Sequence, residues 1–216
     1  MTQIFDEEGQ AIPVTLLEVG PCVIAALRTQ EKDGYMAVQL GFVEKKETRV
    51  SKPLLGYFKK IQVTPKQFLR EIRTESLEGL KVGDQLRVDL FEIDDYVDVE
   101  GVSIGKGFQG VVKRHHFKGG AKSHGSMFGR VAGSIGASSF PSRVVKGMRM
   151  PGQLGNRQAT IQNLKVVKVD LENNLLAVRG GVPGSEGSCL LIRTSLKRGK
   201  AKTWKVEKVE KEKAAA

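Results

Sequence analysis

Short apolar runs rich in β-branched residues occur along both ends of the chain, and turn residues separate them. Their length is typical of strands, and glycine, proline, asparagine and aspartate lie between them. Residues 52–73 have a mixed pattern broken by Pro53, Gly56 and Pro65, which predicts one short helix and one strand. The predicted strands outside this stretch are residues 12–19, 22–28, 35–42, 85–91, 96–103, 162–170, 175–179 and 188–193. Such spacing is typical of a small antiparallel barrel, so we predict a mainly β fold.

The strand-like pattern stops near residue 103 and resumes near residue 161. A long stretch without periodicity is uncommon inside a compact fold unless it is functional or disordered. We therefore predict a discontinuous barrel domain, residues 1–103 and 161–195, interrupted by a long, mostly irregular basic extension at residues 104–160. Residues 196–216 alternate charges and then lose complexity, which predicts a basic, mobile tail.

The charge distribution singles out the same interruption. Residues 101–160 contain ten Lys and Arg, all three histidines and no Asp or Glu. Residues 1–100 hold 13 basic and 18 acidic residues, and residues 161–216 hold 12 and 6, so most of the net charge of +11 belongs to the middle segment. An acid-free cationic segment repels itself, so we expect a polyanion partner, and nucleic acid is favoured over an anionic membrane.

The sequence does not support membrane insertion or secretion. No window reaches the roughly 18 apolar residues of a spanning helix. The first ten residues are acidic and lack the apolar core of a signal peptide. Cys22 and Cys189 lack a C-x-x-C spacing, which favours thiols in a reducing, cytoplasmic compartment over a disulfide framework.

A glycine motif at residues 105–110 matches G-x-G-x-x-G, the dinucleotide-binding fingerprint. That fingerprint requires a following helix and an acidic ribose ligand about 20 residues further on. The sequence VVKRHHF predicts no helix start, and no acid precedes Asp170. We interpret the glycines as a flexible hinge that also lets backbone N–H groups approach phosphates.

The basic side chains of the extension are the predicted RNA contacts. A solvated charged surface is the alternative, but the neighbouring sequence has no compensating acids. Phe117, His115, His116 and His124 are candidates for stacking on, or hydrogen bonding to, unpaired bases. The predicted phosphate contacts are Lys106, Lys113, Arg114, Lys118, Lys122, Arg130, Arg143, Lys146, Arg149 and Arg157.

Neither a metal site nor a catalytic site is predicted. No thiolate or carboxylate accompanies the three histidines, so they lack the ligand set of known zinc sites. The serines of the extension have no His and acid pair beside them, and no P-loop sequence is present. We therefore predict a non-enzymatic protein without a cofactor.

Five stretches resemble the large-subunit ribosomal protein L3 family, in its bacterial or organellar form. They are residues 1–15 (MTQIFDEEGQAIPVT), 101–120 (GVSIGKGFQGVVKRHHFKGG), 123–139 (SHGSMFGRVAGSIGASS), 146–170 (KGMRMPGQLGNRQATIQNLKVVKVD) and 174–184 (NLLAVRGGVPG). The resemblance implies a six-stranded, translation-factor-like barrel with an extension that runs through 23S rRNA toward the peptidyl transferase centre. Family members usually begin about ten residues before the position of Met1, so the start of the first barrel strand departs from the family pattern.

The same resemblance implies partners and a modification. It implies early binding to 23S rRNA, nucleation of large-subunit assembly, and contact with the large-subunit proteins conventionally numbered fourteen and nineteen. In bacterial members a glutamine of the extension is N5-methylated, and Gln153 is the matching residue, which implies a glutamine methyltransferase as a partner. The expected location is the ribosome of the cytoplasm, or of the plastid stroma for an organellar member. A free-standing RNA chaperone or assembly factor, bound to the ribosome only transiently, is the alternative.

Overall fold

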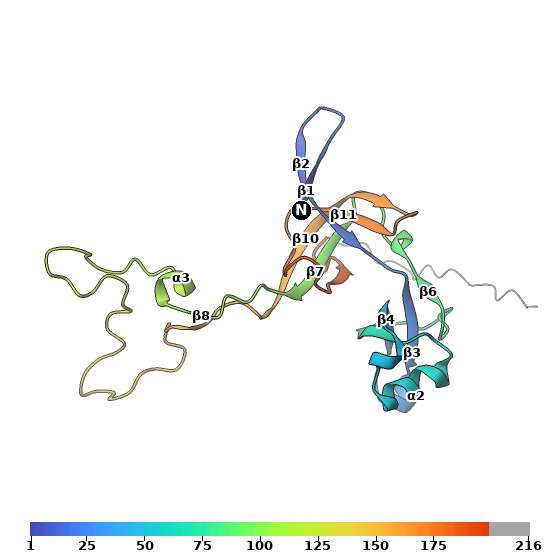
Figure 1. The fold of residues 1–216 in the computed structure, drawn as a ribbon, viewed down its shortest axis with the longest axis horizontal. Coiled ribbons are helices and arrows are strands. Elements are labelled where there is room, and N and C mark those ends of the chain that lie inside the picture. Colours follow the sequence, from blue (N-terminus) through green and yellow to red (C-terminus); the bar gives the residue numbers. More distant parts are fainter. Residues whose placement is uncertain (199–216) are drawn as a thin grey trace, which may run out of the picture. The chain divides into compact units, whose positions relative to one another are not determined.

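The computed structural model describes residues 1–198 of the 216-residue chain. Within this range the chain divides into two compact units (Figure 1). The first unit comprises Met1–Val99, Ile161–Val182 and residues 191–198, and the second comprises Glu100–Thr160 and Pro183–Leu190. Most of the predicted tail, residues 199–216, lies outside the described residues. No helix among the described residues is long and apolar enough to cross a membrane.

The larger sheet has six strands in the order β1-β2-β11-β10-β7-β12. The pairs β1–β2, β2–β11 and β10–β11 are antiparallel. Apolar residues of these strands are buried, among them Val14, Val97, Val99, Leu176 and Val178. The strands are β1 (Thr2–Phe5), β2 (Ala11–Glu18), β7 (Tyr96–Val102), β10 (Gln158–Asp170), β11 (Leu175–Arg179) and β12 (Leu191–Thr194).

A buried carboxylate ties three parts of this sheet together. Asp98 of β7 is only 5% exposed and accepts hydrogen bonds from the backbone N–H groups of Asn163, at 2.9 Å, and Leu196, at 3.2 Å. The Ser195 hydroxyl donates to Asn163 Oδ1 at 2.6 Å. Burial raises the pKa of Asp98, but these hydrogen bonds outweigh burial and lower the pKa below its ordinary value. The ionised carboxylate therefore stabilises the contact between β7, β10 and the end of β12.

The smaller sheet has four strands in the order β5-β4-β3-β6, and α2 packs against it. Ile24, Val38, Leu80 and Leu86 form its buried core, and Phe58 of α2 is 1% exposed. Its strands are β3 (Cys22–Arg28), β4 (Ala37–Glu44), β5 (Lys66–Arg73) and β6 (Gln85–Leu86), and its helices are α1 (Gln30–Asp33) and α2 (Lys52–Ile61), with 3-10 turns at Glu47–Arg49 and Val88–Leu90.

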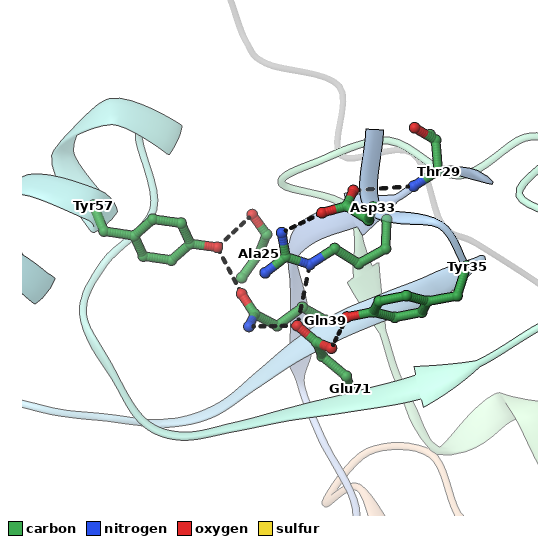
Figure 2. A network of polar contacts seen from close by, with 8 residues as sticks. Ala25, Thr29, Asp33, Tyr35, Gln39, Tyr57 and Glu71 are labelled. Atoms are coloured by element: carbon green, nitrogen blue, oxygen red, sulfur yellow. Dashed lines mark hydrogen bonds and ion pairs between the residues drawn. The ribbon is translucent and has the colours of Figure 1, made fainter. Parts of the chain in front are cut away.

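Polar contacts fasten α2 to the four-stranded sheet (Figure 2). The Tyr57 hydroxyl lies 2.6 Å from Gln39 Oε1 and 3.3 Å from the Ala25 carbonyl oxygen, so α2 is linked to β4 and β3. The Glu71 carboxylate of β5 accepts hydrogen bonds from Arg28, Tyr35 and Gln39. Because the hydroxyl of Tyr35 donates to Glu71, the pKa of Tyr35 is raised. The network holds three neighbouring strands and the helix in one arrangement.

The prediction of a mainly β fold is confirmed, as is the helix followed by a strand within residues 52–73, which are α2 and β5. The described strands form two sheets, and their pairing does not join them into one closed barrel. The predicted strand at residues 85–91 is wrong beyond Leu86, because Val88 is buried from a 3-10 turn instead of from a strand. Asp94 lies in the turn that precedes β7 and has a left-handed φ of 69°.

Candidate nucleic-acid interface

The second unit contains a narrow antiparallel stem, in which residues 103–109 run beside residues 152–157 (Figure 1). Four backbone hydrogen bonds of 2.8–3.0 Å join the two sides. They link Ser103 to Arg157, Ser103 to Asn156, Lys106 to Leu154, and Gly107 to Leu154. The stem ends with the paired strands β8 (Phe108–Gln109) and β9 (Gly152–Gln153). The glycine motif at residues 105–110 therefore lies largely in hydrogen-bonded backbone, whereas a flexible hinge would have few such bonds.

Gly155 makes the close approach of the two stem strands possible. Its φ is +72°, and a Cβ at this position would overlap the carbonyl oxygen of Ile104. The same Cβ would lie 3.1 Å from the Cα of Gly105. Both neighbours are backbone atoms that cannot move aside as a flexible side chain would. The stem geometry thus depends on a glycine at residue 155.

A short helix, α3 (Val111–His115), follows the stem directly. The prediction that no helix starts here is wrong. Val111 and Val112 have low helix propensity, but Val111 is 2% exposed, and its burial outweighs that preference. Lys113, Arg114 and His115 lie in the last turn, where positive charge is favourable for a helix.

Arg114 connects α3 to the returning strand of the stem. Its Nη1 donates a hydrogen bond of 2.6 Å to the carbonyl oxygen of Met150, and His115 Nε2 lies 3.1 Å from the same oxygen. A Cβ at Gly152 would lie 2.6 Å from Arg114 Nη1. Arg114 therefore has a contact within the chain, which the sequence analysis did not find because Met150 is 36 residues away.

The other predicted phosphate contacts are exposed. Nine of the ten are exposed and Arg114 is partly buried. No Asp or Glu occurs within residues 101–160 to neutralise them. The exposed nine are Lys106, Lys113, Lys118, Lys122, Arg130, Arg143, Lys146, Arg149 and Arg157. This unit therefore presents a cationic surface that can bind a polyanion.

The predicted base contacts differ in exposure. Phe117 is partly buried, and its ring centroid lies 6.1 Å from that of His115, which is also partly buried. His116 and His124 are exposed and have left-handed φ angles of 60° and 56°. Among residues 1–198, no three His, Cys, Asp or Glu side chains are grouped so that they could hold a metal ion.

Three further apolar side chains in the same unit are exposed, and the sequence analysis did not select them. Phe108, Met127 and Phe140 are 77%, 97% and 88% exposed. The signal that could have found them is an apolar side chain within an acid-free segment. Phe128 is different, because its ring occupies the space that a Cβ at Gly120 would need. That ring lies against Gly120 and Gly133, although Phe128 remains 44% exposed.

Gln153, the predicted modification site, lies in β9 opposite Phe108. Its side chain is exposed, and its Nε2 lies 3.4 Å from the carbonyl oxygen of Leu154. A side chain in this position is accessible to a modifying enzyme.

Comparison with known proteins gives a consistent result. The sequence profile of the family described as Ribosomal protein L3 matches residues 76–174. A relative from Solibacter usitatus, named large ribosomal subunit protein uL3, is 57% identical over 197 residues, covering 90% of this chain and 94% of that protein. Relatives of the same name from Carboxydothermus hydrogenoformans and Alkaliphilus metalliredigens are 52% and 50% identical, covering 91% and 93% of this chain and 94% and 95% of those proteins. Identity of this size over nearly the whole length shows that the chain belongs to the ribosomal protein L3 family.

Proposed function

We propose that this chain is a structural, non-enzymatic protein of the large ribosomal subunit that binds 23S rRNA directly through its second unit. Family membership supports the ribosomal assignment, because the relatives are named as large-subunit proteins. The observation that carries the RNA assignment is the set of nine exposed Lys and Arg side chains in a segment without acids. Nine phosphate contacts would give a slope of log affinity against log salt of about −6 to −8 through counterion release.

The backbone of the second unit supports a role for the extension inside folded RNA. The stem is hydrogen bonded along its length, whereas the described backbone hydrogen bonds beyond α3 are few, such as Gly120 to Gly129 and Met148 to Val145. A loop of this kind takes its final shape from what surrounds it. A segment enclosed by RNA has to be present while that RNA folds, so we propose that the protein binds early and nucleates large-subunit assembly. We further propose that the extension approaches the peptidyl transferase centre.

The proposed partners follow from the same assignment. They are the large-subunit proteins conventionally numbered fourteen and nineteen, and a glutamine methyltransferase that modifies Gln153. The exposure of Gln153 supports the modification. A mass spectrum of the intact protein from ribosomes tests it, because N5-methylation adds one methyl group that is absent after Gln153→Ala.

The binding experiment compares two pairs of charge reversals in the full chain. Lys113→Glu with Lys118→Glu changes two exposed cations of the second unit, and Lys32→Glu with Lys81→Glu makes the same charge change at exposed positions of the first unit. Affinity for a 23S rRNA transcript is measured at several salt concentrations. We expect the first pair to reduce the magnitude of the salt slope by about 1.5 to 2, and the second pair to leave it unchanged. Wild-type affinity and slope in the first pair would contradict the proposal.

A free-standing RNA chaperone or transient assembly factor is the competing function. Such a protein would bind RNA with the same cationic surface but would leave the finished subunit. Sedimentation of ribosomes after a high-salt wash separates the two functions. A structural protein remains with large subunits in stoichiometric amount, and a chaperone is recovered in the soluble fraction.

A further inference from the structure

A second cationic surface lies in the first unit, on α2 and the 3-10 turn at Glu47–Arg49 that precedes it. Residues 45–60 contain six Lys and Arg and one acid, whereas the rest of residues 1–100 contains seven basic and 17 acidic residues. The exposed cations are Lys46, Arg49, Lys52, Lys59 and Lys60. Within residues 1–100, a net positive charge therefore occurs on one short segment, and the remainder is acidic.

Helical spacing places part of this charge on one face of α2. Counted from Lys52, Gly56 is four residues further on, Lys59 seven and Lys60 eight, and this spacing places them on one side of the helix. All four residues are exposed. On the opposite side, Phe58 is buried and Ile61 is partly buried. Tyr57 links the helix to β3 and β4 through Ala25 and Gln39 (Figure 2). The buried side fixes the helix on the sheet. We call the exposed Lys52, Gly56, Lys59 and Lys60 the α2 cationic face.

The composition of this face does not favour the helix itself. Gly56 lies in the interior of α2, where glycine is the least favourable residue after proline. A Cβ at Gly56 would meet no heavy atom within 4 Å, and its φ is not left-handed, so no contact or turn of the chain requires glycine. Lys52 is the first helical residue, no acid lies in the first turn, and positive charge is unfavourable at that end. Residues that weaken a helix without a reason inside the chain point to a function outside it.

We infer that the α2 cationic face is a second RNA-binding surface, separate in sequence from the extension. Lys52, Lys59 and Lys60 contact phosphates, and Gly56 lets the sugar–phosphate backbone approach the helix backbone closely. Lysine is a common phosphate contact and is depleted from protein–protein interfaces, which favours RNA over a protein partner. The inference rests on the proposed function, because it takes ribosomal RNA as the polyanion.

The test uses the full chain with a 23S rRNA transcript as the probe. One variant carries Lys52→Ala, Lys59→Ala and Lys60→Ala, and its matched control carries Lys32→Ala, Lys81→Ala and Lys168→Ala, which are exposed lysines outside α2. We expect the α2 variant to reduce the magnitude of the salt slope by about 2 to 3, while the control keeps the wild-type slope. Circular dichroism of the unbound variants checks the fold, and alanine at exposed helix positions favours helix formation.

Gly56→Ala separates binding from stability, because the two effects have opposite directions. We expect a higher midpoint of thermal unfolding for the unbound protein, since alanine favours the helix. We expect RNA binding to weaken roughly tenfold if the new Cβ displaces one phosphate contact. Unchanged RNA affinity in both Gly56→Ala and the triple lysine variant would overturn the inference. It would also be overturned if the triple lysine variant kept the wild-type salt slope for RNA but failed to bind a large-subunit protein. A wild-type chain that does not bind the transcript would instead overturn the proposed function.

Discussion

Gly155→Ala is expected to open the stem of the second unit. A non-glycine residue in the left-handed region costs about 1–2 kcal/mol. Relieving the overlap of the new Cβ with the Ile104 carbonyl also requires the strands to separate. The backbone hydrogen bonds nearest to it join Asn156 to Ser103 and Leu154 to Gly107, both at 3.0 Å, and each contributes about 0.5–1.5 kcal/mol net. Together these costs lower the free energy of stem opening by about 2–5 kcal/mol.

Hydrogen exchange measures this change directly. The amide protons of Lys106, Leu154 and Asn156 are donors in the stem, so their protection reports its opening. A loss of about 2–5 kcal/mol corresponds to exchange that is faster by about 30-fold to several thousand-fold. Gly147→Ala is the matched control, because Gly147 has a similar φ of +85° but a Cβ there would meet no heavy atom within 4 Å. Wild-type protection of the three amides in Gly155→Ala would refute the steric reasoning.

Two further predictions concern the first unit. Asp98→Asn is expected to lower the free energy of unfolding at neutral pH by about 1.5–3 kcal/mol, measured by urea denaturation, because charge-assisted hydrogen bonds to two backbone N–H groups are lost. The folded-state pKa of Asp98 is lowered, so its contribution to stability is complete above the unfolded-state pKa and is lost as pH falls through the folded-state pKa. The variant should lack this acid-dependent loss of stability. An identical pH profile in the two proteins would contradict the role given to Asp98. Phe58→Ala should cost about 3–5 kcal/mol by removing a buried ring, whereas Leu54→Ala, at a residue 46% exposed on the same helix, should cost far less. Equal losses in the two variants would show that α2 does not pack through Phe58.

Elements bounded by strong turn residues were the most predictable from the sequence. Strand β3 has the predicted bounds because Gly20 and Pro21 precede it, and β11 has the predicted bounds because Asn173 and Asn174 precede it. Pro53 and Pro65 similarly limit α2 and β5. Elements that depend on distant partners were not predicted. The β8–β9 pair joins residues more than 40 positions apart, and its sequence is rich in glycine instead of β-branched residues, so no local pattern marks it.

The candidate interface shows the same division. Composition alone identified the cationic side chains, and nine of them are exposed as a phosphate-binding surface requires. The contact between Arg114 and the Met150 carbonyl was not predictable, because it depends on how α3 lies against the returning strand. The α2 cationic face was also overlooked, since its lysines lie in the half of the chain with net negative charge. Lys52, Lys59 and Lys60 lie on one face of α2, and the net charge of residues 1–100 does not reveal this local grouping.

The stem has a consequence for the width of the passage it can occupy. Glycines at positions 105, 107, 152 and 155 remove the side chain at four stem positions, so the stem is locally narrower there, where its two backbones lie about 4.8 Å apart. At these positions the ribbon allows another molecule to approach its backbone more closely than an ordinary β-hairpin does. A methyl group at Gly107 would meet no heavy atom of the chain within 4 Å, yet it would thicken the ribbon. In the RNA complex proposed above, the clearance around the stem therefore limits which residues these positions accept, in addition to the left-handed φ of Gly107.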